Sequence, residues 1–177
     1  MRLTGGEARA RLAAARVARL ATAGSDGLPH LVPVTFAVDG ERIYTAVDQK
    51  PKTTPNLRRL RNIRENPRVA LLADHYAEDW DTLWWVRVDG RAIIVTDGAA
   101  LQHPLDMLAE RYQQYRRDRP AGPVIVIDAE RWTGWAGGSQ GHLPGRRLPG
   151  PRGRGSMAAD DLAVRGDGLC GAVGVED

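Results

Sequence analysis

The chain has 177 residues, of which 42% are hydrophobic, and its formal net charge at pH 7 is +3. This length and composition allow one sizeable hydrophobic core, so we expect a single folded domain. The small net charge argues against a broad nucleic-acid-binding face.

The single cysteine, Cys170, excludes an internal disulfide. No apolar run has the length of a membrane span or the form of a signal peptide. We therefore expect a soluble cytoplasmic protein that binds neither nucleic acid nor membrane.

The first 47 residues predict a helix followed by three strands. Thr4 and Glu7 have the spacing of a capping box, which opens an Ala/Arg-rich helix that ends near Arg16. Hydrophobic runs separated by tight-turn residues then predict three antiparallel strands, over residues 17–23, 29–38 and 41–47. Because proline cannot donate a hydrogen bond to a sheet, Pro33 places the second of these strands at an edge or at a bulge.

The stretch 44–67 predicts the end of a strand, a cationic turn and a helix. Thr54 is a good N-cap, and Pro55 suits the first helical position. Apolar residues then recur at helical spacing until an Asn-Pro stop. The turn contains Lys50 and Lys52, the only lysines of the chain. A helix N-terminus offers free N–H groups and the positive end of a dipole, so an anion can bind there. Two ordinary surface charges are the alternative interpretation.

The next segment predicts more strands in hairpins. The expected strands lie at residues 68–74, 82–88, 91–96 and 123–127, with a further strand region at 131–135. Asp89 and Gly90 have the composition of a two-residue turn between the second and third of them. A helix that carries Leu105 and Leu108 should end near Tyr115. Six or seven strands with two or three flanking helices favour a mainly β (α+β), antiparallel barrel over a doubly wound parallel sheet.

The composition changes after Gly138. Residues 139–177 contain 9 Gly and 3 Pro, with no aromatic residue and no steady periodicity. Such a composition is typical of disorder or loose packing. We therefore expect a folded domain over residues 1–138 and a tail over residues 139–177 on which the fold does not depend. A linker, an interaction tail and an accident of gene history remain open as explanations of this tail.

Two groups of aromatic and small residues are candidates for a binding groove. Trp84 and Trp85 are adjacent in an expected strand, so their side chains point to opposite faces. One of them should pack in the core, and the other can face a groove. Tyr44 and Ala46 share one strand face, where a residue as small as Ala46 would let a flat ring approach the backbone.

Familiar catalytic and metal-binding patterns are absent from the sequence. It contains no Ser/His/Asp arrangement, no metal-spaced cysteines and no glycine-rich dinucleotide loop. The acidic loop with His75, Asp79 and Asp81 is compatible with a metal, but such loose loops are more often only solvated. His30 is expected to be structural. The catalytic side chains are therefore not identified, and we expect no bound metal.

A series of short segments in the first 138 residues resembles one family. These segments are residues 19–22, 26–30, 32–34, 44–48, 50–52, 60–63, 66–69, 79–80, 84–92 and 132–135. Each segment alone is weak, but their order and spacing are fairly specific. In them the chain resembles the flavin- and deazaflavin-binding split β-barrel family, whose founding type is pyridoxamine 5′-phosphate oxidase. Within that family it is most similar to the branch of F420-dependent oxidoreductases.

The resemblance implies a split β-barrel that binds coenzyme F420, or alternatively FMN, in a groove between the two protomers of a homodimer. It also implies that the phosphate end of the cofactor meets basic residues near the helix that follows the third strand. A mixed set of Lys and Arg can hold both phosphate and carboxylate groups. The candidates for binding the cofactor are Lys50, Lys52, Arg59, Arg61 and Asn62 at its anionic end, and Tyr44, Ala46 and Trp85 along its ring.

The implied activity is F420-dependent hydride transfer between the cofactor and a small organic substrate, which the sequence does not identify. The chemistry of this reaction belongs mostly to the cofactor, and the protein supplies position, exclusion of water and charge near the ring. Two alternatives stay open. One is an FMN-binding flavin oxidase or reductase of the same fold, and the other is a non-catalytic protein that binds the cofactor.

Overall fold

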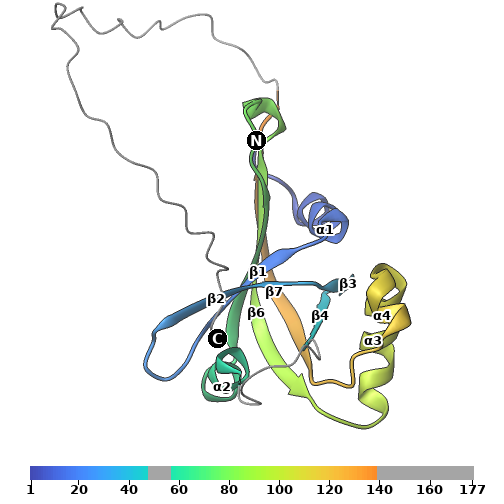
Figure 1. The fold of residues 1–177 in the computed structure, drawn as a ribbon. Helices are drawn as coiled ribbons and strands as arrows, with labels where there is room; N and C mark the ends of the chain where they lie inside the picture. The colour runs from blue at the N-terminus through green and yellow to red at the C-terminus, as the bar shows by residue number, and fades with distance from the viewer. Residues whose placement is uncertain (48–56, 139–177) are drawn as a thin grey trace, which may run out of the picture. The chain divides into compact units, whose positions relative to one another are not determined.

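The computed structural model describes residues 1–47 and 57–138 (Figure 1). Lys50, Lys52, Thr54, Pro55 and the tail over residues 139–177 lie outside the described residues. The described strands are β1 (Ala18–Ala23), β2 (Pro29–Val34), β3 (Ala37–Asp39), β4 (Arg42–Ala46), β5 (Arg68–His75), β6 (Trp84–Val95) and β7 (Val124–Ala136). The helices are α1 (Gly5–Ala14), α2 (Arg58–Glu65), α3 (Gln102–Arg111) and α4 (Gln113–Arg117), with 3-10 turns η1 (Trp80–Thr82) and η2 (Ala99–Leu101).

The seven strands form one antiparallel sheet in the order β2-β1-β5-β6-β7-β4-β3. The prediction of a mainly β, antiparallel fold with flanking helices is confirmed. The sheet does not close on itself, which is compatible with a split barrel. Strand β2 lies at one edge, as its proline Pro33 predicted, because proline cannot donate to a second neighbour.

The longest strands correct the prediction of a turn at Asp89 and Gly90. Strand β6 continues through both residues, and its pairing with β7 shifts register there. A Cβ on Gly90 would lie only 2.3 Å from the carbonyl oxygen of Asp128. The glycine therefore permits a close approach of two strands at a β-bulge rather than a chain reversal. Strand β7 likewise joins into one strand the two regions predicted at 123–127 and 131–135.

The strand predicted over residues 29–38 is interrupted. Strand β2 ends at Val34, and β3 begins at Ala37. Between them the backbone N–H of Phe36 donates to the hydroxyl of Tyr112 at 3.0 Å, and that hydroxyl lies 2.9 Å from the Phe36 carbonyl oxygen. Because a side chain from the α3–α4 junction satisfies both backbone groups, the chain can leave the sheet at this point.

The first helix begins as predicted and ends earlier. The backbone N–H of Thr4 donates to the Glu7 carboxylate at 2.7 Å, and the Thr4 hydroxyl accepts from the Glu7 N–H at 3.3 Å, which confirms the capping box. The helix ends at Ala14, where the guanidinium of Arg111 donates to the carbonyl oxygens of Ala13 and Ala15. These long-range bonds satisfy the carbonyls that another helical turn would use.

The second helix corrects the predicted start. Helix α2 begins at Arg58, and its N-cap is Leu57, which has no side-chain capping bond. The helix predicted from Thr54 and Pro55 thus starts three residues late. The structure also has four α-helices in its described part rather than two or three. The predicted helix over 101–115 is divided at Tyr112, whose extended backbone separates α3 from α4.

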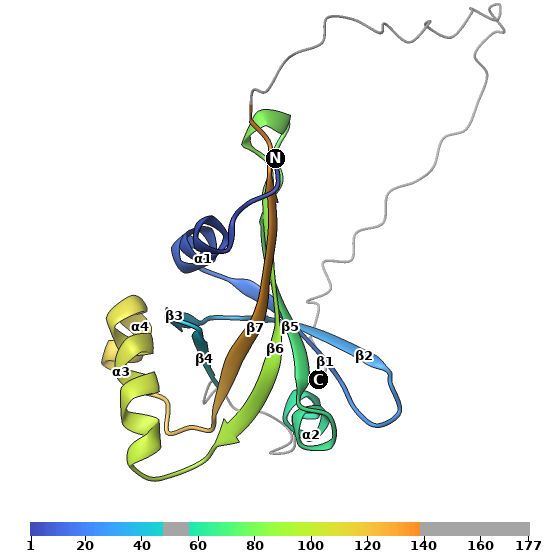
Figure 2. The same cartoon turned by 180° about the vertical axis from the view of Figure 1, so that it is seen from behind.

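Two clusters of buried side chains hold the sheet and its helices together. The larger one lies beneath α1 and α2 and includes Leu12, Leu20 and Phe36. The smaller one lies between α3, α4 and the β3–β4 end of the sheet, and it includes Tyr44 and Leu108. Figures 1 and 2 show α3 and α4 together beside β3 and β4, with α2 at the lower end of β5. Among the described helices, none combines the length and apolar character that crossing a bilayer requires.

Candidate functional site

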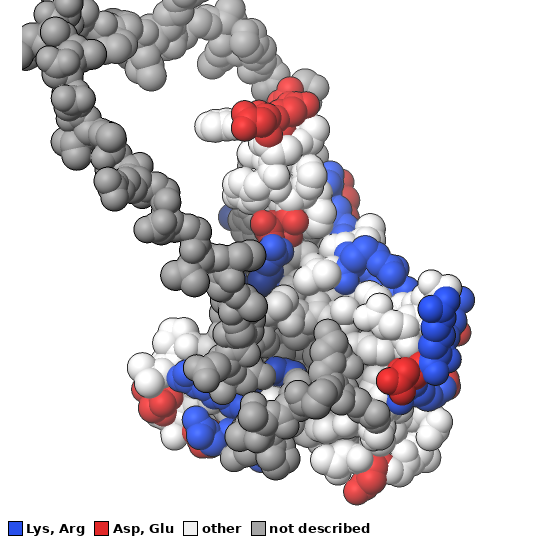
Figure 3. All heavy atoms as spheres, viewed as in Figure 1, with Lys and Arg blue, Asp and Glu red and all other residues white. Residues whose placement is uncertain are grey.

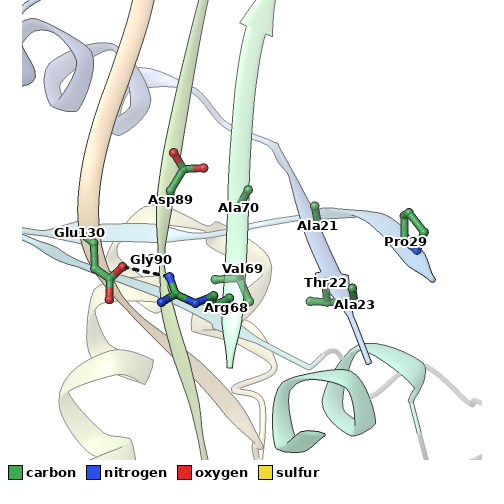
Figure 4. Close-up of a pocket in the computed structure, with 10 residues that line it drawn as sticks. All are labelled: Ala21, Thr22, Ala23, Pro29, Arg68, Val69, Ala70, Asp89, Gly90 and Glu130. Carbon is green, nitrogen blue, oxygen red and sulfur yellow. Dashed lines mark ion pairs between the residues drawn. The ribbon is translucent and has the colours of Figure 1, made fainter. Parts of the chain in front are cut away.

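One face of the strands β2, β1, β5, β6 and β7 points away from the larger buried cluster, and we call it the outer face. It carries two hollows. The lower hollow has a volume of about 370 Å³ and is shown in Figure 4. It is lined by Ala21, Thr22, Ala23, Pro29, Arg68, Val69, Ala70, Asp89, Gly90 and Glu130. The upper hollow has a volume of about 390 Å³. It is lined by Arg2, Trp85, Thr133, Gly134 and Trp135. Both volumes fall within the usual range of small-molecule sites.

The floor of the lower hollow is flat and apolar, and its rim is charged. Ala21 and Ala70 are directly opposite each other on β1 and β5, so two small side chains form the floor. Arg68 and Glu130 point toward each other across the rim, with 3.9 Å between guanidinium nitrogen and carboxylate oxygen (Figure 4). Such a surface can accept a planar group, while its polar rim offers both signs of charge.

The charges between the two hollows are paired. The carboxylate of Asp89 accepts hydrogen bonds from Arg87 at 3.1 Å and from Arg131 at 2.7 Å. At the same level of the sheet, Arg19 donates to Asp74 at 2.6 Å. Since two arginines share the one carboxylate of Asp89, these ion pairs leave one positive charge in excess in the middle of the outer face.

The two adjacent tryptophans lie on opposite faces, as predicted. Trp84 packs against the core, and the guanidinium of Arg11 lies 5.8 Å from its ring centre. Trp85 lines the upper hollow on the outer face. Its neighbour across the strands is Trp135, which is 37% exposed. The position of Trp135 could be found from sequence only with the β6–β7 register, which the wrongly predicted turn at Asp89 concealed.

Helix α2 presents a group of arginines. Figure 3 shows basic side chains gathered over this helix at the lower left of the molecule. The arginines of α2 are Arg58, Arg59, Arg61 and Arg64. The side chain of Arg61 is 55% exposed, and among the described residues it forms one ion pair, a 4.0 Å contact with Glu65. Lys50 and Lys52, which we expected beside this helix, lie outside the described residues.

Two polar contacts fasten α2 to β1 and to the turn after it. The side-chain amide of Asn62 donates to the hydroxyl of Thr22 at 3.1 Å, and both residues are buried. Glu65 accepts hydrogen bonds from the backbone N–H of Ser25 at 2.9 Å and from its hydroxyl at 3.0 Å. These bonds lower the pKa of Glu65. Asn62 therefore holds the helix in place and does not face solvent as an anion ligand would.

Tyr44 and Ala46 lie beneath α3. The ring of Tyr44 is 3% exposed and meets His103 edge-on at 5.8 Å between ring centres. Its hydroxyl donates to Asp39 at 3.3 Å. Ala46 packs against the same buried cluster. The side chains of these two residues are therefore covered by this chain's own helix.

Tyr44 and Trp85 lie far apart within one chain. Tyr44 pairs with Val126 of β7, whereas Trp85 pairs with Trp135 of the same strand. Nine residues of strand separate these partners, which corresponds to roughly 30 Å. The structure thus brings together Arg59, Arg61 and Asn62 on α2. Tyr44 and Ala46 point to the other face of β4, since they pack with α3, whereas Ile43 belongs to the buried cluster that includes α2. Trp85 lies at the opposite end of the sheet. In residues 1–47 and 57–138, no group of three or more His, Cys, Asp or Glu is placed to hold a metal.

Comparison with known proteins identifies similar chains. A family model described as Pyridoxamine 5'-phosphate oxidase matches residues 4–136. A Streptomyces rimosus protein named 5a,11a-dehydrotetracycline/5a,11a-dehydrooxytetracycline reductase is 33% identical over 87 residues. The alignment covers 49% of this chain and 60% of that protein, so the chain spans less than two thirds of the length of this relative.

Solved structures with the same fold come from several bacteria. An FAD-binding protein from Mesorhizobium loti has a TM-score of 0.61 and 25% sequence identity, and the match covers 76% of this chain and 93% of that one. A conserved hypothetical protein from Mycobacterium tuberculosis has a TM-score of 0.60 and 26% identity, with 76% and 85% covered.

Proposed function

Because the chain belongs to the pyridoxamine 5′-phosphate oxidase family, as its sequence predicted, we propose that it is an oxidoreductase that uses coenzyme F420 to transfer hydride to or from a small organic substrate. The observation that carries this proposal is the family match over residues 4–136, which spans all seven described strands. The similarity to a protein named as a reductase supports the same class of chemistry. Location in the cytoplasm, without nucleic-acid or membrane partners, stays a prediction.

A flavin is the second candidate for the cofactor. The similar structure from Mesorhizobium loti is that of an FAD-binding protein. F420 carries a phosphate and a poly-glutamate tail, so it has more negative charge than FMN. The arginines of α2, together with Lys50 and Lys52, favour the more anionic of the two cofactors.

The residues present fit the anionic end of such a cofactor. Arg61 is half exposed, and α2 is fastened through Asn62 and Glu65, so its arginines extend from a fixed helix. Bound F420 or flavin supplies the hydride-transfer chemistry. The chain itself would hold the anionic tail at α2, place Trp85 against the ring and limit the access of water to it.

We further propose that the working form is a homodimer. Leu31 on β2 and Leu72 on β5 leave apolar surface exposed on the outer face of the sheet, at 64% and 36% exposure. A second copy related by a twofold axis can bury such a face. In the proposed arrangement α2 of one protomer lies beside Trp85 of its partner, so that one cofactor meets both.

Binding measurements with F420 and FMN test the proposed function. Purified protein is titrated with each cofactor, and the change in cofactor fluorescence is followed. We expect F420 to bind more tightly than FMN. The double variant Lys50→Ala/Lys52→Ala and the variant Arg61→Ala should each weaken F420 binding by about tenfold per lost contact, since a charge-assisted hydrogen bond contributes about 1.5–3 kcal/mol. High salt should reduce the difference.

The control is Arg117→Ala, which removes an exposed arginine of α4 and should leave the affinity unchanged. Tighter binding of FMN than of F420 would replace the first candidate by the second. Absence of binding for both cofactors would reject the proposed function. If F420 binds, reduced F420 offered together with unsaturated and quinone-like compounds tests for the substrate, because oxidation of the cofactor can be followed optically.

A further inference from the structure

A row of four side chains crosses the upper end of the outer sheet face. Arg2 bridges to Trp135, Trp135 lies opposite Trp85, and Trp85 lies opposite Asp74. Residues directly opposite each other in antiparallel strands point to the same face, with Cβ atoms about 4.5–5.5 Å apart. The two indole rings are therefore neighbours, with a guanidinium group on one side and a carboxylate on the other.

The chain before α1 fixes Arg2 beside this tryptophan pair. The backbone N–H of Leu3 donates to the Gly134 carbonyl at 2.9 Å, and the N–H of Ala136 donates to the Met1 carbonyl at 2.9 Å. Leu3 is buried on the inner face, where a Cβ on Gly134 would lie 2.9 Å from its Cδ1 atom. Because side chains alternate along an extended segment, Arg2 must point to the outer face.

The electrostatic balance of the row favours an anion. Asp74 is neutralised by Arg19, whose guanidinium donates to it at 2.6 Å. Arg87, in the adjacent row, is paired with Asp89 at 3.1 Å. In the described part of the chain, no ion pair involves Arg2. The positive charge beside Trp135 is thus the uncompensated charge of the row.

The shape and exposure of the hollow favour a planar aromatic group. Its volume of about 390 Å³ lies within the range of small-molecule sites. Trp135 is 37% exposed, and exposed aromatic surface next to a cation is typical of a binding surface. Stacking on an indole requires a flat π-face, and a saturated ring lacks one.

We propose that Arg2, Trp85 and Trp135 form a binding site for a planar aromatic anion, such as an aromatic carboxylate. The indole rings stack on the aromatic part, and the guanidinium pairs with the acidic group. As a substrate site this assignment rests on the proposed function, and Trp85 is then the residue that cofactor and substrate share. As a binding site it depends only on the geometry of the row.

Binding of 2-naphthoate to the full chain, without cofactor, tests the site. The protein is labelled with ¹⁵N-tryptophan, and its five indole N–H signals are assigned by single substitutions. We expect 2-naphthoate to shift the signals of Trp85 and Trp135. Neutral 2-naphthamide should bind about tenfold more weakly, because it lacks the charge for Arg2. Cyclohexanecarboxylate should bind at least about fivefold more weakly, because it cannot stack.

Matched variants separate the site from general surface binding. Trp135→Leu should weaken 2-naphthoate binding at least about fivefold, and Arg2→Gln about tenfold. The controls are Trp80→Leu, which removes a tryptophan that is 78% exposed and does not line the hollow, and Arg117→Gln on α4. Both controls should leave the affinity unchanged. Circular dichroism of each variant confirms that it is folded.

Three results would overturn the assignment. One is the absence of any shift at Trp85 and Trp135. Another is an equal loss of affinity in Trp135→Leu and Trp80→Leu. The third is that the indole signals of Trp85 and Trp135 do not shift with 2-naphthoate but change when the protein is diluted. That result would mean that a second copy covers the tryptophans. Titration of the same samples with F420 and FMN separates the two proposals: cofactor binding without naphthoate binding rejects this site alone, and naphthoate binding without cofactor binding rejects only the proposed function.

Discussion

Asn62 and Arg61 are neighbours on α2 with opposite surroundings. Asn62 is 2% exposed and donates to Thr22, whereas the side chain of Arg61 is 55% exposed. We predict that Asn62→Ala lowers the free energy of unfolding by about 1–3 kcal/mol, because Thr22 loses its buried partner. Arg61→Ala should change it by less than about 0.5 kcal/mol. Urea unfolding measures both, and F420 titration should show the reverse order of effects. A stable Asn62→Ala variant with weak F420 binding would instead support the ligand role expected from sequence.

The carboxylate of Asp39 predicts a loss of stability in acid. It accepts hydrogen bonds from His103 at 2.8 Å and from Tyr44 at 3.3 Å. The His103 bond is the largest cause that lowers the pKa of Asp39 below its ordinary value of 3.8. Since this pKa is lower in the folded than in the unfolded state, the stabilisation is complete above the ordinary value. It is lost as the pH falls through the lowered value.

We therefore expect the melting temperature of the wild type to fall as the pH drops below about 4. Asp39→Asn should show a smaller fall over the same range, because its side chain does not titrate. Calorimetry from neutral pH into acid measures both profiles. Asp118→Asn, at an exposed position after α4, is the control and should follow the wild type. Parallel profiles for the wild type and Asp39→Asn would show that the Asp39–His103 contact adds no stability.

Individual residues differed in how far their roles could be predicted. The opposite faces of Trp84 and Trp85 follow from strand geometry alone, so the sequence was sufficient. Asn62 stands among arginines on α2, and only its tertiary contact with Thr22 distinguishes a structural amide from a ligand. Tyr44 was expected to share a strand face with Ala46, and it does. That α3 covers this face depends on packing between distant parts of the chain.

The bulge in β6 gives a prediction at the level of the element. A Cβ on Gly90 would meet the Asp128 carbonyl oxygen at 2.3 Å, and backbone atoms cannot move aside cheaply. Gly90→Ala should lower the free energy of unfolding by more than about 2 kcal/mol. Gly6→Ala is the matched control, since a Cβ there meets nothing within 4 Å. That change should stabilise α1 by about 0.5–1 kcal/mol. Equal denaturant midpoints for Gly90→Ala and the wild type would contradict the close approach.

Elements were predicted well where the cause is local and poorly where it is not. The capping box of α1 involves residues three apart, and it was found from sequence. Asp89 and Gly90 have the composition of a turn, but the neighbouring strand β7 converts them into a bulge. For α2, the good capping residues Thr54 and Pro55 precede a helix that starts only at Arg58. In the first of these two cases the pairing with a distant strand overrides local preference.

At the scale of the whole chain, the order of the elements sufficed for the fold. Consecutive hairpins predicted an antiparallel sheet, and the sheet order β2-β1-β5-β6-β7-β4-β3 agrees with that class. The candidate site could be predicted only in part. Its proposed residues on β4, α2 and β6 lie at opposite ends of one sheet, and a sequence carries no direct record of which surfaces a second copy brings together.

The tail beyond Gly138 gives a further prediction for the whole molecule. Residues 139–177 contain 9 Gly and 3 Pro, a composition that orders little. A chain that ends at Gly138 should keep its melting temperature and its F420 affinity. A chain that ends at Trp132 is the control, because it loses the last four residues of β7 and the pairing of Trp85 with Trp135. If the melting temperature of the chain that ends at Gly138 falls by more than a few degrees, the tail stabilises the fold.

The proposed homodimer predicts that the outer face of β2 and β5 is an interface. Leu31 on β2 is 64% exposed, and Leu72 on β5 is 36% exposed. Large apolar side chains on an edge strand and its neighbours favour burial against another copy. Light scattering at micromolar concentration should give a dimer for the wild type and a monomer for Leu31→Glu/Leu72→Glu. Gln113→Glu, at an exposed position on α4, is the control and should stay dimeric.

The double variant Leu31→Glu/Leu72→Glu also tests whether the dimer completes the cofactor site or only stabilises the chain. If one cofactor touches α2 of one protomer and Trp85 of its partner, separation of the protomers must remove half of its contacts. The monomeric variant should then lose F420 affinity by at least about tenfold, while circular dichroism shows an intact sheet. A folded monomer with the affinity of the wild type would place the whole cofactor site within one chain. In that case Trp85 of the partner subunit would take no part in binding the cofactor.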